Sequence, residues 1–243
     1  YDAQTDDQQL TAAVMSSAEK LGAVVYTNST FDRADCKQDN CTAHFTQNGS
    51  LRSITTKLII NTSGPWVNQV LKKIQPEQST LDIELVLGTH IIINGQLTKG
   101  IYYLEAPQDQ RAVFAMPWKN QIMIGTTETL FNDSPENITS PEADIDYLLE
   151  VYNAYFKQQK SRSDIEASFA GLRVLPRSSG SAFSRPRDTI IHHDHSPQAC
   201  IFTLYGGKLT AHRATADQLM NLVRPFLPRT KRNIDTRKLR LTD

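Results

Sequence analysis

Two short glycine-containing segments, each between an apolar run and a helical pattern, are the places where this sequence could hold a ligand. Gly206–Lys208 follow the apolar run Ile201–Leu204, and a helical pattern begins near Thr210. Ser63–Gly64 follow the apolar run Leu58–Ile60 in the same way. A strand that turns at glycine into a helix directs backbone N–H groups and the positive end of the helix dipole at whatever lies above the turn. Both turns therefore predict contacts to an electron-rich ligand at the carboxyl edge of a parallel sheet.

Three side chains that could bind an anion or transfer a proton lie in or beside apolar runs. Arg173 lies within SFAGLRVL, and an arginine in an apolar strand needs an anionic partner. Arg185 follows in AFSRPRD, where Arg187 could take the same role. His90, within GTHIII, has the intrinsic pKa of a general base, although a lone histidine in a strand is more often structural. Both interpretations of His90 stay open at this point.

The cysteines and histidines do not predict a metal site. The chain has three cysteines, Cys36, Cys41 and Cys200. An odd number of cysteines at no metal-ligand spacing favours a reducing compartment over a disulfide scaffold. The chain also has a histidine run, His192, His193 and His195. Neighbouring strand residues point to opposite faces, so we expect no metal there.

Composition and charge predict a globular protein without a nucleic-acid partner. The 243 residues are 39% hydrophobic, enough to form a substantial core. Lys plus Arg and Asp plus Glu are both 26, so no net field attracts nucleic acid or an anionic membrane. Tyr1 opens no signal peptide, and no apolar run approaches the roughly 18 residues that would span a bilayer. The expected location is cytoplasmic.

The first quarter of the chain predicts a helix followed by strands. Thr5 and Gln8 form a capping box for a helix at about Asp6–Leu21. Ala23–Tyr26 is an expected short apolar strand. Phe31–Ser53 carries turn signals between short runs and predicts a β-meander or hairpin.

The rest of the chain predicts an antiparallel sheet between two segments with helical patterns. Trp66, Val70 and Ile74 would line one face of a helix that begins at Pro65. Residues 81–130 read as consecutive strands with short connections, which means antiparallel pairing. A long helix is expected after Ser140-Pro141, ending near Lys160, and two further strands are expected in IEASFAGLRVL and DTIIHH.

These elements predict an α/β (α+β) fold in which an antiparallel sheet is inserted into a Rossmann-like domain. We expect residues 1–80 to form the later part of the Rossmann-like domain and residues 81–198 the antiparallel domain. Residues 199–243 would return to the first domain as a strand, a helix and a tail. The chain opens abruptly without an initiator methionine, and we expect it to be a fragment of a longer protein.

Eight motifs in register over nearly the whole chain resemble the FAD-dependent, respiratory-type glycerol-3-phosphate dehydrogenases. The motifs are NTSGPWV, LGTHIII, FAMPW, MIGTTE, IDYLLEVYNAYF, SFAGLRVLP, AFSRPRDTII and YGGKLTAHRATA. The parent superfamily is the glycine/D-amino-acid oxidase-like (DAO) flavoproteins. The resemblance implies an FAD domain and an antiparallel substrate domain, together with oxidation of sn-glycerol 3-phosphate to dihydroxyacetone phosphate. Hydride would pass to the flavin, and electrons would then pass to a quinone.

The resemblance also implies roles for particular residues. His90 would be the base or hydroxyl-binding group, and Arg173 and Arg185 would bind the substrate phosphate. Lys208 would contact substrate and flavin and stabilise developing negative charge. The remaining cofactor-binding positions would be Ser63, Gly64, Gly206, Gly207, Leu209 and Thr210.

The chain departs from that family in one large way, because the amino-terminal GxGxxG segment that holds the ADP part of FAD is absent. We therefore expect the missing amino-terminal half of the same protein to be a partner, and the fragment alone to be inactive. A smaller departure is Thr89 where the family has serine. A homodimer and a peripheral contact on the cytoplasmic side of the membrane stay open.

Two alternatives to this function remain. The complete protein could be another hydroxy- or amino-acid oxidase of the superfamily, which a substrate panel would reveal. The chain could instead be a non-catalytic, stand-alone binding module that never had a flavin half. An in-frame GxGxxG segment upstream of Tyr1 would exclude the module.

Overall fold

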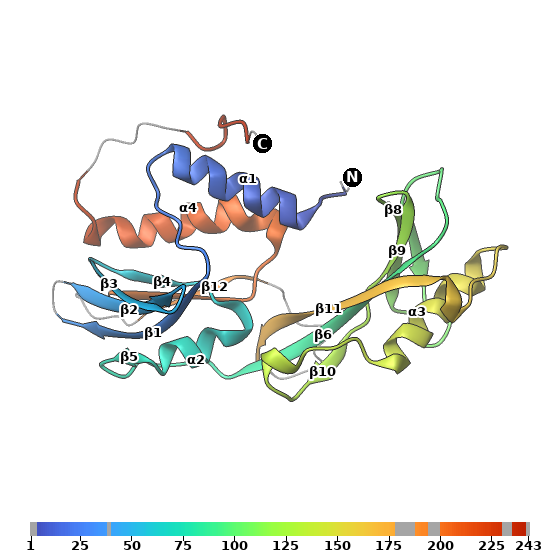
Figure 1. The fold of residues 1–243 in the computed structure, drawn as a ribbon, viewed down its shortest axis with the longest axis horizontal. Helices are drawn as coiled ribbons and strands as arrows, with labels where there is room; N and C mark the ends of the chain where they lie inside the picture. The colour runs from blue at the N-terminus through green and yellow to red at the C-terminus, as the bar shows by residue number, and fades with distance from the viewer. Residues whose placement is uncertain (1–3, 38–39, 178–187, 194–199, 230–234, 242–243) are drawn as a thin grey trace. The chain divides into compact units, whose positions relative to one another are not determined.

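The computed structural model describes residues 4–37, 40–177, 188–193, 200–229 and 235–241. The chain forms two compact units, which are described separately (Figure 1). Unit 1 comprises residues 1–63, 67–80 and 187–243, and unit 2 comprises residues 64–66 and 81–186. The expected mixed α/β fold is confirmed. No helix in the described part of the chain is long and apolar enough to cross a membrane.

Unit 1 contains a four-stranded sheet that begins as an antiparallel meander. Its strands are β1 (Ser29–Cys36), β2 (Cys41–Gln47), β3 (Ser50–Thr56) and β5 (Ile74–Gln75), in the order β3-β2-β1-β5. The turn between β2 and β3 uses Asn48 and Gly49, both with positive φ (49° and 78°), as a tight two-residue hairpin requires. The predicted meander is therefore confirmed.

A second sheet of unit 1 joins the two ends of the chain. It has the order β12-β13-β4, from β12 (Ile190–His193), β13 (Ile201–Tyr205) and β4 (Ile59–Asn61). β13 and β4 are parallel neighbours, whereas β12 runs antiparallel to β13. A 3₁₀ turn (η5, Leu209–Ala211) leads into α4 (His212–Val223), and α4 ends in a second 3₁₀ turn (η6, Arg224–Phe226). Leu219 and Val223 of α4 pack on Phe202 of β13.

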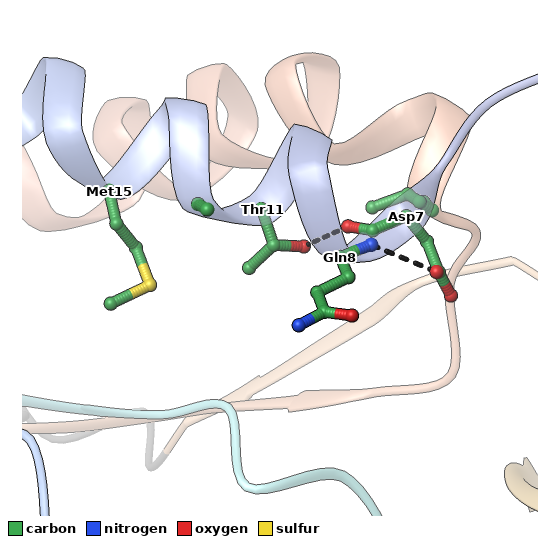
Figure 2. A pocket seen from close by; sticks show the side chains of 6 residues that line it. Asp7, Gln8, Thr11 and Met15 are labelled. Atoms are coloured by element: carbon green, nitrogen blue, oxygen red, sulfur yellow. Dashed lines mark hydrogen bonds between the residues drawn. The ribbon is translucent and has the colours of Figure 1, made fainter. Parts of the chain in front are cut away.

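The helix α1 (Asp7–Lys20) matches the expected segment, but its cap and the strand after it do not. The capping residue is Asp6, whose carboxylate accepts a hydrogen bond from the Gln9 amide, so the capping box predicted at Thr5 is wrong. Residues 23–26 form no strand, because Val24 is 72% exposed and no described strand pairs with it. Both figures show α1 running beside α4 (Figures 1 and 2).

The helix predicted after Pro65 is shorter than expected. The chain forms a 3₁₀ turn (η1, Gly64–Trp66) and then α2 (Val67–Leu71). Ile74 was expected on the same helix face, but it begins β5, which pairs in parallel with β1. The helix therefore ends at Leu71, and Ile74 is fully buried as a strand residue.

Unit 2 is a six-stranded antiparallel sheet with one helix on one face. Its strands are β6 (Ile83–Ile93), β7 (Tyr102–Glu105), β8 (Ala112–Trp118), β9 (Gln121–Gly125), β10 (Thr129–Phe131) and β11 (Ile165–Pro176). The order is β10-β6-β9-β8-β7, and β11 pairs with β6 along almost its whole length. The predicted antiparallel arrangement is confirmed.

The helix α3 (Glu142–Tyr155) covers one face of this sheet and forms a hydrophobic core with it. Ile145, Leu148, Val151 and Tyr152 pack against alternate residues of β6, β8 and β9. Short 3₁₀ turns lie before α3 (η2, Pro135–Asn137) and after it (η3, Arg162–Asp164). The helix was expected to reach Lys160, but it ends at Tyr155 because Phe156 adopts an extended backbone.

The prediction that the cysteines form no disulfide is wrong for the first two. Cys36 ends β1 and Cys41 begins β2, and the hairpin register places them directly opposite each other. Their Cα atoms are 4.0 Å apart, and the two sulfurs are bonded. Strand pairing thus brings together two thiols that the cysteine count alone did not relate.

Candidate functional site

The face of the unit 2 sheet that α3 leaves open carries a row of aromatic side chains around one glycine. The strand registers place Tyr103, Phe114, Gly125, His90 and Phe169 opposite one another, in the order β7-β8-β9-β6-β11. Directly opposed residues project to the same face of a sheet. The alternate residues of β6 pack under α3, so this row lies on the opposite face. The face offers a ligand flat apolar rings and one imidazole.

His90 is held in this row by a ring on one side and a glycine on the other. Its imidazole stacks on Phe169, with ring centroids 5.0 Å apart and an interplanar angle of 4°. A Cβ added at Gly125 would lie 2.1 Å from Cδ2 of His90, closer than any two such atoms can pack. The sequence therefore needs glycine at 125 so that the imidazole can lie across β9.

Arg173 lies on the same face and has an anionic partner within the chain. Its Nη1 donates to Oε1 of Glu128 at 2.8 Å, with the two side chains 27% and 16% exposed. Its Nη2 also lies 3.5 Å from Oγ1 of Thr126. An arginine in an apolar strand was expected to need an anion, and Glu128, which sequence reasoning missed, supplies one. Glu128 could have been found as the acidic end of the MIGTTE motif.

The guanidinium of Arg173 lies beside Gly88 of β6, although Arg173 itself is opposite Val86 on that strand. A Cβ added at Gly88 would lie 3.2 Å from Nη2 of Arg173. Gly88 is two residues from His90, so it occupies the next position on the same face of β6. Two of the residues singled out from the sequence, His90 and Arg173, are therefore brought together on one open face.

A buried acidic residue supports this face from behind. Oδ2 of Asp144, in the first turn of α3, accepts hydrogen bonds from the hydroxyls of Thr89 (2.7 Å) and Thr127 (2.6 Å). The Thr127 hydroxyl in turn accepts from the backbone N–H of Thr89 at 2.9 Å. Asp144 is 9% exposed, so these bonds satisfy a carboxylate that would otherwise be costly to bury. The network fixes the segment that carries Thr126 and Glu128.

In unit 1, the predicted Ser63 turn is organised by a buried asparagine. Asn61 is the last residue of β4 and is 3% exposed. Its Nδ2 donates to the carbonyl of Val67 at 3.0 Å, and its Oδ1 accepts from the hydroxyl (2.6 Å) and the backbone N–H (3.2 Å) of Ser63. Gly64 follows with φ of 56°, and a Cβ there would meet no atom within 4 Å. Asn61 was missed by sequence reasoning and acts as the brace of this turn.

The second predicted turn follows β13, the parallel neighbour of β4. Gly206 and Gly207 have φ of 70° and 96°, a region that favours glycine. A Cβ at Gly207 would also lie 2.7 Å from Oγ1 of Thr189, so two separate constraints require glycine there. Lys208 and Leu209 come next and are both exposed. The turn leaves backbone groups and one ammonium available to an anion, as expected of a ligand-binding turn.

A pocket of about 570 Å³ lies between α1 and Leu209. Its wall on α1 consists of Asp7, Gln8, Thr11, Ala12 and Met15, and Figure 2 shows Gln8, Thr11 and Met15 on one side of the helix. The Thr11 hydroxyl donates to the carbonyl of Asp7 at 2.8 Å, within the helix. Leu209 is the only residue in its wall that was predicted to bind a ligand, so this pocket adjoins the glycine turn without containing it.

The structure says less about the remaining residues that were predicted to be functional. Arg185, Arg187 and His195 lie outside the described residues. His192 and His193 have different partners, because Nε2 of His192 lies 2.9 Å from Oγ of Ser79 while His193 packs on Phe202. Thr210 is exposed within η5, and α4 begins two residues later than the sequence suggested.

Comparison with known proteins gives the same family across most of the chain. The family described as "FAD dependent oxidoreductase" matches residues 1–213. The chain is 31% identical over 232 residues to the aerobic glycerol-3-phosphate dehydrogenase of Escherichia coli K12, covering 93% of this chain and 46% of that protein. It is 29% identical over 233 residues to the D-erythritol 1-phosphate dehydrogenase of Brucella abortus, with the same coverages. The chain thus spans about half the length of the curated relatives it matches.

A solved structure has a similar fold. The glycerol-3-phosphate dehydrogenase of Bacillus halodurans, solved in complex with FAD, superposes with a TM-score of 0.79 at 24% identity. The match covers 91% of this chain and 43% of that one. This likeness supports the fold assigned to the chain.

Proposed function

Because the chain belongs to the FAD-dependent oxidoreductase family, we propose that it supplies the substrate-binding sheet and part of the cofactor-binding unit of a polyol-phosphate dehydrogenase. The proposed reaction of the complete protein is the oxidation of sn-glycerol 3-phosphate to dihydroxyacetone phosphate, with electrons passing to a quinone. The observation that carries the proposal is that His90 and Arg173 lie on one face of the unit 2 sheet, with the Arg173 guanidinium beside Gly88, two residues from His90. A base beside a cation is what a phosphorylated alcohol requires.

The residues of the two glycine turns fit the flavin part of FAD. Gly206 and Gly207 have positive φ, a backbone conformation that favours glycine, and a Cβ at Gly64 would meet no atom within 4 Å. Such turns present N–H groups to an electron-rich ring or anion. When bound, FAD supplies the acceptor for the hydride of the alcohol carbon. Lys208, Leu209 and Thr210 would hold it from one turn, and Ser63 and Gly64 from the other.

Each candidate for acting on the substrate has a separate proposed role. Arg173, held by Glu128, binds the phosphate, since a guanidinium forms charge-assisted hydrogen bonds with phosphate oxygens. His90 removes the proton of the secondary hydroxyl, and its stacking on Phe169 fixes the direction in which its ring nitrogens point. Lys208 stabilises negative charge that develops as the alcohol is oxidised. Arg185 would add a second cation for the phosphate.

A substrate panel on the complete protein tests this function. We expect a clear preference for glycerol 3-phosphate over glycerol, D-amino acids and other unphosphorylated substrates. D-erythritol 1-phosphate belongs in the panel because one relative is named for it. A preference for erythritol phosphate would keep the polyol-phosphate class and change the substrate. A preference for any substrate without a phosphate would contradict the proposal.

A further inference from the structure

Three cysteine sulfurs from distant parts of the sequence lie together in unit 1. The Sγ atoms of Cys36, Cys41 and Cys200 all lie within 4.8 Å of one another. Cys41 is fully buried, whereas Cys36 and Cys200 are half-buried. Cys36 and Cys41 share a disulfide, and Cys200 is the third thiol beside it. The cluster therefore has both a sheltered side and a side that a small ion can reach.

The fold places these sulfurs where the two sheets of unit 1 meet. Cys36 and Cys41 are paired at the end of the β1–β2 hairpin where the chain connects the two strands, and the Lys37 amide donates to the Asn40 carbonyl at 2.8 Å within the same hairpin. Cys200 immediately precedes β13, and its carbonyl accepts from the Ile59 amide at 2.7 Å. Backbone hydrogen bonds thus fix all three positions, so the sulfurs approach one another without a dedicated loop.

This cluster is separate from the candidate flavin turns. Cys200 lies at the amino end of β13, whereas Gly206 lies at its carboxyl end. At ~3.3 Å per residue the two ends of the strand are about 20 Å apart. The cysteines therefore do not belong to the cofactor-binding edge described above.

We propose that reduction of the Cys36–Cys41 disulfide converts this cluster into a three-thiolate site for a soft divalent metal ion such as Zn²⁺. Zn–S bonds of ~2.3 Å place neighbouring sulfurs of one ion roughly 3.8 to 4 Å apart. Opening the disulfide lets its two sulfurs separate to that spacing, and Cys200 already lies within 4.8 Å of both. The fourth coordination position of the ion lies on the side of the half-buried Cys36 and Cys200 and is filled by water.

The chemistry balances with a dithiol as the reductant. The dithiol gives two electrons and two protons to the disulfide, which becomes two thiols, and the dithiol itself becomes a cyclic disulfide. Binding of Zn²⁺ then replaces the protons of three thiols, and these protons pass to solvent. The disulfide form and the metal form are therefore alternative states of the same sulfurs, selected by the redox environment.

The test is a zinc titration of the reduced full chain against a chromogenic chelator. We expect one Zn²⁺ per chain, and no comparable binding by the chain with its disulfide intact. Cys200→Ser should weaken zinc binding by more than the roughly 10- to 100-fold typical of losing an outer-shell partner, because it removes a ligand. His193→Ala is the matched control, since it removes a potential zinc ligand of another type from the strand beside β13, and it should leave zinc affinity unchanged.

A second readout avoids dependence on the folding of the variants. In the reduced wild-type chain, zinc should slow alkylation of Cys200, measured by mass spectrometry of the peptide that contains it. Equal alkylation rates with and without zinc would overturn the proposal. Loss of zinc binding in His193→Ala with retention in Cys200→Ser would overturn it as well, because the ligands would then be histidines.

Discussion

Arg173 and Glu128 form an ion pair of 2.8 Å on the sheet face that also carries His90. The pair orients the guanidinium that we propose binds the substrate phosphate. Arg173→Ala in the complete protein should therefore lower kcat/KM for glycerol 3-phosphate about 10- to 150-fold, equivalent to ~1.5–3 kcal/mol. Arg162→Ala is the control, because Arg162 pairs with exposed Asp146 of the same unit. Equal kinetics for the two variants would remove Arg173 from the site.

The same pair should behave as one unit in a double-mutant cycle. Glu128→Gln keeps the shape of the side chain but removes the charge that holds Arg173. In the wild-type background, Glu128→Gln should change kcat/KM measurably. In the Arg173→Ala background, the same substitution should change kcat/KM little. The expected coupling free energy is about 0.5–3 kcal/mol, the range for residues in contact. Additive effects would mean that Glu128 does not position the guanidinium.

Gly125 tests how tightly His90 is held. Gly125→Ala puts a methyl group 2.1 Å from the present position of Cδ2 of His90, so the imidazole must move. We expect a loss of about 1–3 kcal/mol in the free energy of unfolding, the usual cost of overpacking, measured by denaturant titration. Gly171→Ala is the control, because a Cβ there meets no atom within 4 Å and the position lies in the same sheet. A similar loss in both variants would show that the collision with His90 is not the cause.

The sequence predicted the elements whose patterns are local. The β-meander, the antiparallel sheet of residues 81–130 and the two glycine turns follow from alternation and turn residues, and the structure contains them. Residues 23–26 look like a strand in the sequence, but strands exist only where a neighbour pairs with them, and no described strand does. Ile74 was wrongly assigned to a helix for the same reason. Its place in β5 depends on parallel pairing with β1, which is distant in the sequence.

The site was predictable only for residue types that are unusual in their context. Arg173 in an apolar strand and glycines between strand and helix are visible in a single sequence. Asn61, Glu128 and Asp144 are ordinary polar residues in the sequence, and their roles depend on partners that lie from 2 to 55 residues away. The cysteine cluster was missed for the same reason, because Cys200 is far from Cys36 and Cys41 in the sequence, although the three sulfurs are close in space.

Asp144 is expected to matter more for stability than its neighbour Asp146. Asp144→Ala leaves two buried hydroxyls, those of Thr89 and Thr127, without their acceptor. Unsatisfied buried groups cost about 1–3 kcal/mol each, so the variant should lose a large part of the stability of unit 2. Asp146→Ala breaks only an exposed ion pair with Arg162 and should cost ~1 kcal/mol or less. Denaturant midpoints of the two variants give the comparison, and equal losses would contradict it.

Tyr147 should make the stability of unit 2 depend on pH in the alkaline range. Burial, and then the hydrogen bond that its hydroxyl donates to Asp109 at 2.8 Å, raise the pKa of Tyr147 to about 12. In the unfolded chain a tyrosine ionises at ~10. The folded pKa is the higher one, so the contribution is complete below about pH 10 and is lost as the pH rises toward 12. The stability advantage of the wild type over Tyr147→Phe should therefore shrink across this interval, as measured by denaturant titration at a series of pH values. An advantage that stays constant, or that grows with pH, would mean that the phenol is not held in its neutral form by the fold.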